Sequence, residues 1–489
     1  MQKKNYFLCA LIMLLSVAVQ AAPTVIVLDG KLTRKDHQTY LEVPFKVPAG
    51  TDRVTVEFSY DRSEGTTIDL GLLDSERLRG WSGGNKSHFT LAETDATPSY
   101  LPGPLPAGEW RLLLGIPNIR EGITTAYTAR ITLQHGAEAF TESFTDQKLA
   151  DGARWYRGEL HAHTGHSDGG CRAQSGEKKP CPLLHTVQAA AERGLDFISI
   201  SEHNARSQYN GLRELQAYYD RLLLIPGREI TTFYGHANIF GSTGFVDFRV
   251  TDGNVRPLQD KLPEIGAIMS INHPGLPSGE ACMGCGWTAE TDYTRVTAIE
   301  VVNGSVLKRA SGQLNHPFSG IPFWEALLDQ GYRISAIAGS DNHDAIHEKD
   351  QLSGIGLPLT AIYAESLSQP SLLDGLRAGR VFIDLQGKTD RSLEIEARSA
   401  DRNAGMGAVL HVDGPVTVSV RVQGITDAKM RLIAGGKAIE QQGELEGDLW
   451  QTEFTLPKGR DLKWLRVEIL DANGNPQLLS NPVYIEANS

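Results

Sequence analysis

Histidines and carboxylates in the middle of this chain gather in short runs that follow apolar segments. His161 and His163 stand two residues apart after the strand-like run 153–160, and Asp168 follows a short turn later. Residues i and i+2 of a strand point to the same face, so both imidazoles can meet one ion. A lone His-x-His is a weak signal. The rest of the chain makes it a strong one.

Comparable groups stand at the ends of the other apolar runs in this region. They are Glu202-His203-Asn204 after 195–200, Glu229 after 222–225, His236 before 237–240, Asn272-His273 after 266–271, and Asp341-Asn342-His343 after 334–338. Six histidines and three carboxylates at strand ends are hard to explain as core packing, and imidazole with carboxylate suits zinc, manganese or iron. The candidate ligands are His161, His163, Asp168, His203, Glu229, His236, His273, Asp341 and His343. They are too many for one ion, so we expect two or three divalent ions, with a carboxylate such as Glu229 shared between two of them.

The elements that must position these residues alternate between strand-like and helical runs, which is typical of an α/β domain with parallel strands. We expect this domain over 151–388. Its predicted strands are 153–160, 195–200, 222–225, 237–240, 266–271, 296–302 and 334–338, and its predicted helices are 186–194, 211–219, 322–330 and 370–378. Seven strands approach the count of a barrel, whose sites gather at the carboxyl ends of the strands.

The flanking regions are read as β structure. Short alternating runs between turn residues predict a β-sandwich over 24–150 and a second sandwich-like module over 391–489. Residues 1–21 have the charged, apolar and small-residue order of a secretory signal peptide, with an uncleaved membrane anchor as the alternative. We therefore expect an exported protein, periplasmic or extracellular, with no membrane span in the mature chain.

Four cysteines remain after the signal peptide, and an even number in an exported chain suggests disulfides. The favoured pairs are Cys171–Cys181 and Cys282–Cys285, and the rival is a structural zinc site of four thiolates. The net charge of −12 argues against nucleic-acid binding, which normally needs a basic face. The expected partner is a small-molecule or phosphoester substrate.

Residues 153 to about 385 resemble the PHP superfamily, named for polymerase and histidinol phosphatase domains. The resemblance rests on His161-Ala162-His163 with Ser167-Asp168, Glu202-His203-Asn204, Glu229 with His236, Asn272-His273-Pro274, and Ser340-Asp341-Asn342-His343. It implies a distorted (β/α)7 barrel that hydrolyses phosphoesters at a two- or three-metal centre. Many members have Asp-His-Asn where this chain has Glu202-His203-Asn204, which leaves the orientation of His203 open. Among exported members, the chain looks most like the carbaryl-hydrolase-type metallohydrolase branch.

The same resemblance implies how the ligands divide among the ions. One ion would take His161, His163, Glu229 and Asp341, a second would share Glu229 and add His236 and His273, and a third would use Asp168, His203 and His343. The catalytic residues would be Asp341, Glu229 and His343. In the expected reaction a metal-bridging hydroxide attacks phosphorus while the ions neutralise the developing charge.

Three residues near these ligands are candidates for substrate binding. Arg206 and Arg228 can hold a phosphate or pair with a neighbouring carboxylate, and Trp287 can stack on a ring or plug its own loop. The sequence thus predicts an exported metal-dependent hydrolase, most specifically a phosphoesterase. The alternatives are hydrolysis of a carboxylic ester, amide or carbamate at the same centre, and a cell-surface binding or scaffold protein with an inert barrel.

Overall fold

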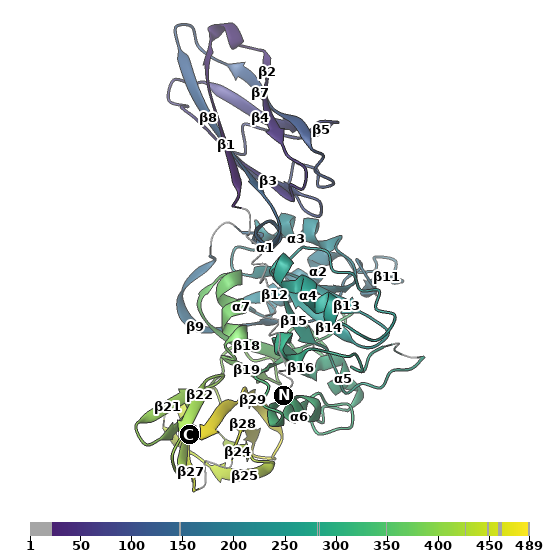
Figure 1. Ribbon diagram of the computed structural model, residues 1–489, viewed down its shortest axis with the longest axis vertical. Helices are drawn as coiled ribbons and strands as arrows, with labels where there is room; N and C mark the ends of the chain where they lie inside the picture. The colour runs from purple at the N-terminus through teal and green to yellow at the C-terminus, as the bar shows by residue number, and fades with distance from the viewer. Residues whose placement is uncertain are drawn as a thin grey trace, which may run out of the picture.

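The computed structural model describes residues 22–145, 148–280, 282, 284–348, 350–425, 427–446, 449–457 and 462–487. The signal peptide expected over 1–21 lies outside these residues. The protein is a multidomain, mostly β-sheet structure (Figure 1), with an N-terminal pair of sheets at one end, a mixed sheet with helices in the middle, and C-terminal strands at the other end.

The N-terminal module consists of two four-stranded antiparallel sheets. Their orders are β1-β8-β3-β6 and β2-β7-β4-β5. Alternating apolar side chains of both sheets, such as Val54, Leu72 and Leu112, meet in one core. The elements are β1 Thr24–Thr33, the 3-10 helix η1 Arg34–Asp36, β2 Tyr40–Val47, β3 Arg53–Tyr60, β4 Thr67–Leu73, β5 Leu78–Gly83, β6 His88–Ala92, β7 Gly108–Asn118 and β8 Thr124–Gln134.

A buried ion triad joins this module to the central one. Asp95 lies between Arg53 of β3 and Arg213, with Arg53 Nη1 2.9 Å and Arg213 Nε 2.5 Å from Asp95 Oδ2. The Arg53 and Asp95 side chains are fully buried. A buried charge is tolerated only when it is paired, so this triad fixes how the two modules meet.

The central module contains the run β9, β12, β13, β14, β15, β16 and β17, hydrogen-bonded in that order. All seven predicted strands are present. The strands are β9 Ala150–Glu159, β10 Gly170–Arg172, β11 Lys178–Pro180, β12 Phe197–His203, β13 Leu223–Thr231, β14 His236–Phe240, β15 Ile268–Ile271, β16 Ala298–Asn303, β17 Ser335–Gly339, β18 Leu359–Leu367 and β19 Val381–Asp384. The helices are α1 Ala137–Thr141, α2 Leu183–Glu192, α3 Gln208–Gln216, α4 Arg256–Ile265, η2 Tyr293–Arg295, α5 Gly304–Arg309, α6 Ile321–Asp329 and α7 Gln369–Arg377.

The pairing in this sheet departs from the regular repeat of a (β/α)7 barrel. β14 is antiparallel to both β13 and β15, and β18 is antiparallel to β9. β14 runs antiparallel to β13 because the connection between these two strands is too short for a helical crossover and can only make a hairpin. The two ends of the run nevertheless approach each other: a parallel bridge joins Ala162 to Asn342, and Asp341 N donates to His161 O over 2.8 Å.

The C-terminal strands continue the central sheet. β19 pairs with β29 in antiparallel register, and the sheet runs on through β28, β24 and β25, so hydrogen bonds cross the boundary expected near residue 391. A separate five-stranded sheet has the order β21-β20-β23-β27-β26. The elements are β20 Ser392–Ser399, β21 Arg402–Gly405, β22 Val409–Val412, β23 Val416–Gln423, β24 Ala428–Ala434, β25 Lys437–Gln442, β26 Glu444–Glu446, β27 Leu449–Leu456, β28 Trp464–Asp471, β29 Pro476–Ser480 and β30 Val483–Ala487.

Candidate metal centre

One edge of the central sheet carries the predicted ligands. His161 follows β9, His203 ends β12 and Asp341 follows β17, and these strands present their carboxyl ends at the same edge. His236 arrives there from the other direction because it opens the antiparallel strand β14. His203 lies directly opposite Glu229 in the β12–β13 register. The order of the strands thus brings residues that are far apart in the sequence close together in space.

The structure brings all nine predicted ligands together in four overlapping groups. Within each group the nitrogen and oxygen atoms lie within 4.8 Å of one another. The groups are His161, His163 and Glu229; His161, His273 and Asp341; His203, Glu229 and His236; and His163, Asp168, His203 and His343. Because Glu229 and three of the histidines belong to two groups each, the groups form one continuous cluster.

The spacing of the ligand atoms fits shared ions. His161 Nε2 lies 3.4 Å from Glu229 Oε1 and 3.4 Å from Asp341 Oδ1, and His163 Nε2 lies 3.5 Å from Glu229 Oε2. Two atoms bound to one ion at about 2.1 Å are themselves roughly 3.0–3.4 Å apart. His161 Nε2 is buried and makes no hydrogen bond among the described residues, so it is placed to face a bound cation.

The predicted division of these ligands among three ions stays a prediction. His236 and His273, expected on the same ion, both face Glu229 Oε1, with His236 Nδ1 at 3.3 Å and His273 Nε2 at 3.4 Å. His273 also groups with His161 and Asp341, and His236 with His203. His273 has left the strand geometry of β15, with φ at 27°, and its ring turns towards His161, 5.8 Å away between ring centres. Glu229 keeps its predicted central place, because one of its oxygens lies 3.4 Å from His273 Nε2 and the other 2.8 Å from His203 Nδ1.

A carboxylate that the sequence reasoning missed lies behind the ligands. Glu300, buried in β16, places Oε1 2.9 Å from His161 Nδ1, and its Oε2 accepts the backbone N–H of His273 over 3.0 Å. Asn303 donates to the same Oε2 over 3.0 Å. An acceptor on Nδ1 fixes the imidazole orientation and leaves Nε2 for the ion. The signal was present, since Glu300 is the one charged residue in the apolar run 296–302.

Backbone carbonyls orient two further histidines. His273 Nδ1 donates to the carbonyl of Cys285 over 3.1 Å, and His343 Nδ1 donates to the carbonyl of Asp341 over 2.9 Å. Both arrangements direct Nε2 into the cluster. Asp341 itself has φ at 52°, a left-handed conformation that is strained for a residue with a side chain. Strain of this kind collects where a side chain must be aimed at a site.

Glu202, where this chain departs from the common Asp, is buried behind the cluster. It accepts hydrogen bonds from the hydroxyls of Thr164 and Ser167, and it is not a member of any of the four groups. These bonds hold the turn that ends in Asp168. The Asp168 carboxylate then reaches His343 Nε2 at 3.4 Å and His203 Nε2 at 3.7 Å.

The charges of the cluster favour bound cations. Burial alone would raise the pKa of Glu229, but His203, His161 and His236 outweigh it and hold the pKa well below its usual range. Burial would likewise raise the pKa of Asp341, and His161 and His163 lower it. Burial lowers the pKa of His163 to about 4, so this imidazole is neutral and able to bind metal. The carboxylates are therefore ionised in a buried pocket that attracts positive charge.

Two disulfide loops flank the cluster, with the predicted pairs Cys171–Cys181 and Cys282–Cys285 at Cα separations of 4.9 Å and 5.6 Å. The first loop is tied to the site by Gly170 N, which donates to the carbonyl of His343 over 2.8 Å. The second supplies the Cys285 carbonyl that orients His273. Pairing of these cysteines agrees with an oxidising environment.

The predicted substrate-binding residues are placed differently from one another. Arg206 is partly exposed, with its guanidinium 5.2 Å from the ring centre of Phe245 and 3.7 Å from Glu93. Arg228 is buried and donates to the carbonyl of Gly244 over 2.8 Å, on the face of β13 opposite Glu229, and the structure does not bring it among the ligands. Trp287 is also buried: it packs on Gly235 and donates to Thr291 Oγ1 over 3.0 Å.

Among known proteins, the chain is similar to distantly related solved structures. No family model and no curated protein matches the chain. A solved structure from Bacteroides vulgatus ATCC 8482 is described as a two-domain protein containing a predicted PHP-like metal-dependent phosphoesterase. It is 19% identical, covers 70% of this chain and 98% of its own, and has a TM-score of 0.38. Nothing in these comparisons supports the carbaryl-hydrolase-type branch.

No helix among the described residues combines the length and the apolar character needed to cross a membrane.

Proposed function

We propose that this protein is an exported metal-dependent hydrolase that cleaves phosphoric esters, using two or three divalent ions held by the nine-residue cluster. The carrying observation is the position of Glu229. Its two oxygens face different histidines, with Oε1 3.4 Å from His161 Nε2 and Oε2 2.8 Å from His203 Nδ1. A carboxylate placed between two groups of ligands is what holds closely spaced ions together.

The proposed metal ligands are the nine predicted residues, and zinc, manganese and iron all suit their mixture of nitrogen and oxygen. When bound, such ions lower the pKa of water and neutralise charge on a phosphoryl group. The chain's own residues set the geometry: Glu300, the Cys285 carbonyl and the Asp341 carbonyl hold three imidazole rings in place. Preorganised groups of this kind need no rearrangement during the reaction.

The exposure of the ligands indicates where the substrate enters. Asp168 and His343 keep 58% and 34% of their side chains exposed, whereas Glu229 and His161 keep 1% each. The substrate therefore approaches from the side of Asp168 and His343. We place His343 at the leaving-group side, and Asp341 and Glu229 deeper, where they position the reacting groups. Arg206, which is partly exposed and follows the ligand His203 by three residues, is the proposed phosphate contact.

The test is a substrate panel on full-length protein supplied with zinc or manganese, with metal content measured on the same preparation. The panel contains a phosphate monoester, a phosphodiester, a carboxylic ester and an aryl carbamate, all chromogenic. Asp341→Asn and Glu229→Gln are the inactivating variants. His411→Gln is the matched control, because His411 lies on β22 and is 53% exposed, outside all four groups.

Phosphoester turnover that is lost in both variants and kept in the control is the expected result. Turnover of the ester or carbamate alone would overturn the phosphoester assignment and move the reaction to carbonyl carbon. A preparation that retains no metal at micromolar concentrations would overturn the whole proposal and leave a binding or scaffold role.

A further inference from the structure

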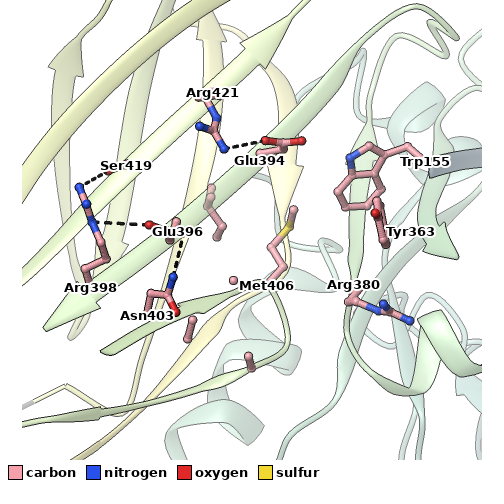
Figure 2. A pocket seen from close by; sticks show the side chains of 14 residues that line it. Trp155, Tyr363, Arg380, Glu394, Glu396, Arg398, Asn403, Met406, Ser419 and Arg421 are labelled. Carbon is pink, nitrogen blue, oxygen red and sulfur yellow. Dashed lines mark hydrogen bonds and ion pairs between the residues drawn. The ribbon is translucent and has the colours of Figure 1, made fainter. Parts of the chain in front are cut away.

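A cleft of about 820 Å³ lies where the central sheet meets the C-terminal five-stranded sheet. Trp155 of β9 and Tyr363 of β18 form one wall, and side chains of β20, β21 and β23 form the other (Figure 2). None of the nine residues of the metal cluster lines it. The volume falls within the range of about 300–1,000 Å³ that is usual for small-ligand sites.

The first wall is aromatic. Trp155 and Tyr363 are directly opposite each other in the antiparallel β9–β18 register, and their ring centres are 5.5 Å apart in an edge-on arrangement. Phe382 packs edge-on against Trp155 at 4.7 Å, which holds the indole in place. The Trp155 and Tyr363 side chains are half-buried, so each ring keeps part of its surface open to the cleft.

The aromatic wall also has an unused hydrogen-bond donor. Trp155 Nε1 makes no hydrogen bond with any residue that the structure describes. In Figure 2 the nitrogen-bearing side of the indole faces Glu394 across the gap. A tryptophan N–H that is shielded from water usually has an acceptor, and the described residues supply none.

The second wall is polar and already ordered. Successive outward positions of β20 carry Glu394, Glu396 and Arg398, while the alternate positions are buried in the core. Arg421 of β23 lies opposite Glu394 in register and donates to its Oε2 over 3.1 Å. Asn403 of the next strand donates to Glu396 Oε2 over 3.3 Å. These pairs hold carboxylate and guanidinium groups side by side in fixed positions.

The charges of the cleft nearly cancel, which selects the kind of ligand. Arg398 and Arg421 are balanced by Glu396 and Glu394, and Arg380, 5.5 Å over the Tyr363 ring, lies 3.5 Å from Glu365 outside the cleft. A phosphate or polyanion would meet two carboxylates, and a cation would meet three guanidinium groups. A neutral ligand with many hydroxyls meets neither penalty, because carboxylates accept from its hydroxyls and guanidinium groups donate to them.

We infer that this cleft binds a neutral saccharide, with the apolar face of a sugar ring on Trp155 and Tyr363 and its hydroxyls on the Glu394–Arg421 and Glu396–Asn403 pairs. Aromatic wall, ordered polar wall and balanced charge all match an uncharged polyol with one apolar face. The site is separate from the metal cluster and does not depend on the activity proposed for it. A glycan bound here would hold the protein on a polymer while the metal cluster stays open.

The test is isothermal titration of the full-length protein with soluble hexasaccharides. The probes are cellohexaose, maltohexaose, xylohexaose, mannohexaose and chitohexaose, with hexagalacturonate as the anionic comparison. We expect saturable binding of at least one neutral probe and weaker binding of hexagalacturonate. Tyr363→Ala should weaken the neutral probe by about tenfold or more, and Asn403→Ala by several-fold, as expected when an aromatic or a polar contact is lost.

Three variants make the result decisive. Asn403 is exposed on the β21 strand, so Asn403→Ala tests the site even if Tyr363→Ala disturbs packing. Tyr218→Ala removes a tyrosine that is 80% exposed on another surface and should leave binding unchanged. Asp341→Asn should also leave it unchanged. The inference is overturned if no neutral probe binds at millimolar concentrations, if Asp341→Asn abolishes binding, or if hexagalacturonate binds as tightly as the neutral probes.

Discussion

Glu300 and His161 form a buried pair at the back of the metal cluster, with Glu300 Oε1 2.9 Å from His161 Nδ1. The other nitrogen of the same ring faces Glu229 and Asp341. One carboxylate thus fixes the ring while two others share the space that it faces. The role of Glu300 can therefore be tested separately from that of the ligands.

Glu300→Gln should weaken metal binding without abolishing it. The variant keeps the shape of the side chain and removes the negative charge behind His161, and losing such a partner costs about 10- to 100-fold in metal affinity. Competition with a chromogenic chelator measures the change. Glu264→Gln, an exposed carboxylate on α4, is the matched control and should bind as the unaltered protein does. Equal affinities for all three proteins would refute a positioning role for Glu300.

Removal of metal should destabilise the central module selectively. Glu229, Asp341 and the surrounding histidines are buried together, and ions that bind only the folded state stabilise it by mass action. Treatment with a chelator should therefore lower the thermal transition of the central and C-terminal strands and leave that of the N-terminal sheets in place. Differential scanning calorimetry resolves the two. A trace that does not change after complete metal removal, verified by elemental analysis, would contradict the proposed centre.

Asp95→Asn should loosen the joint between the N-terminal and central modules. Asp95 is buried between Arg53 and Arg213, and removing its charge takes the carboxylate partner from Arg213 and leaves Arg53 with Glu142 alone, at a cost of about 3–5 kcal/mol. Denaturant unfolding followed by fluorescence measures the loss, with the exposed Asp220→Asn as control.

The pH dependence of this joint has a definite sign. Burial would raise the pKa of Asp95, but Arg53 and Arg213 hold the pKa well below its usual value. The stabilisation is therefore complete above the unfolded pKa of about 3.9 and is lost only as the pH falls further towards the folded value. The difference between Asp95→Asn and the unaltered protein should stay constant from pH 8 to pH 5 and shrink below pH 4. A difference that vanishes already at pH 6 would exclude this origin.

The contribution of Asp384 to stability should depend on pH in the opposite direction to that of Asp95. Burial in β19 raises its pKa to about 6, against the lowering effect of Arg391. The folded protein thus holds this proton more tightly than the unfolded chain, and stability falls as the pH rises from about 4 through 6. Asp384→Asn removes this pH dependence. The free energy of unfolding of the variant, relative to that of the unaltered protein, should therefore rise by roughly 3 kcal/mol between pH 4 and pH 7.5. Urea unfolding at both pH values checks this, and an advantage that is independent of pH would contradict it.

The metal cluster was predictable because its residues obey local rules. His161 and His163 share a face through the two-residue period of a strand, and parallel strands bring their carboxyl ends to one edge. The same period could have excluded Arg228, since it precedes Glu229 by one residue and must face the other way. The hairpin that brings His236 to the cluster and the turned backbone of His273 were not predictable, because no local sequence pattern marks either of them.

Long-range pairing accounts for the other differences between prediction and structure. The strand pattern of 391–489 predicted β structure correctly but contained no sign that β29 pairs with β19, since pairing partners depend on the whole sheet. The cleft beside Trp155 could not be predicted from the sequence for the same reason. Trp155 is more than 200 residues away from every other residue that lines the cleft, and no local pattern joins them.

The hydrogen bonds between β19 and β29 also determine where this protein can be divided into fragments for experiments. A truncation at residue 391 would strip the partner from β19 and expose its backbone donors and acceptors, together with buried residues such as Phe382 and Ile383. The central and C-terminal strands therefore form a single structural unit, whereas the N-terminal sheets share no strand pairing with it. Any fragment library of this chain should be cut between β8 and α1 and not near residue 391.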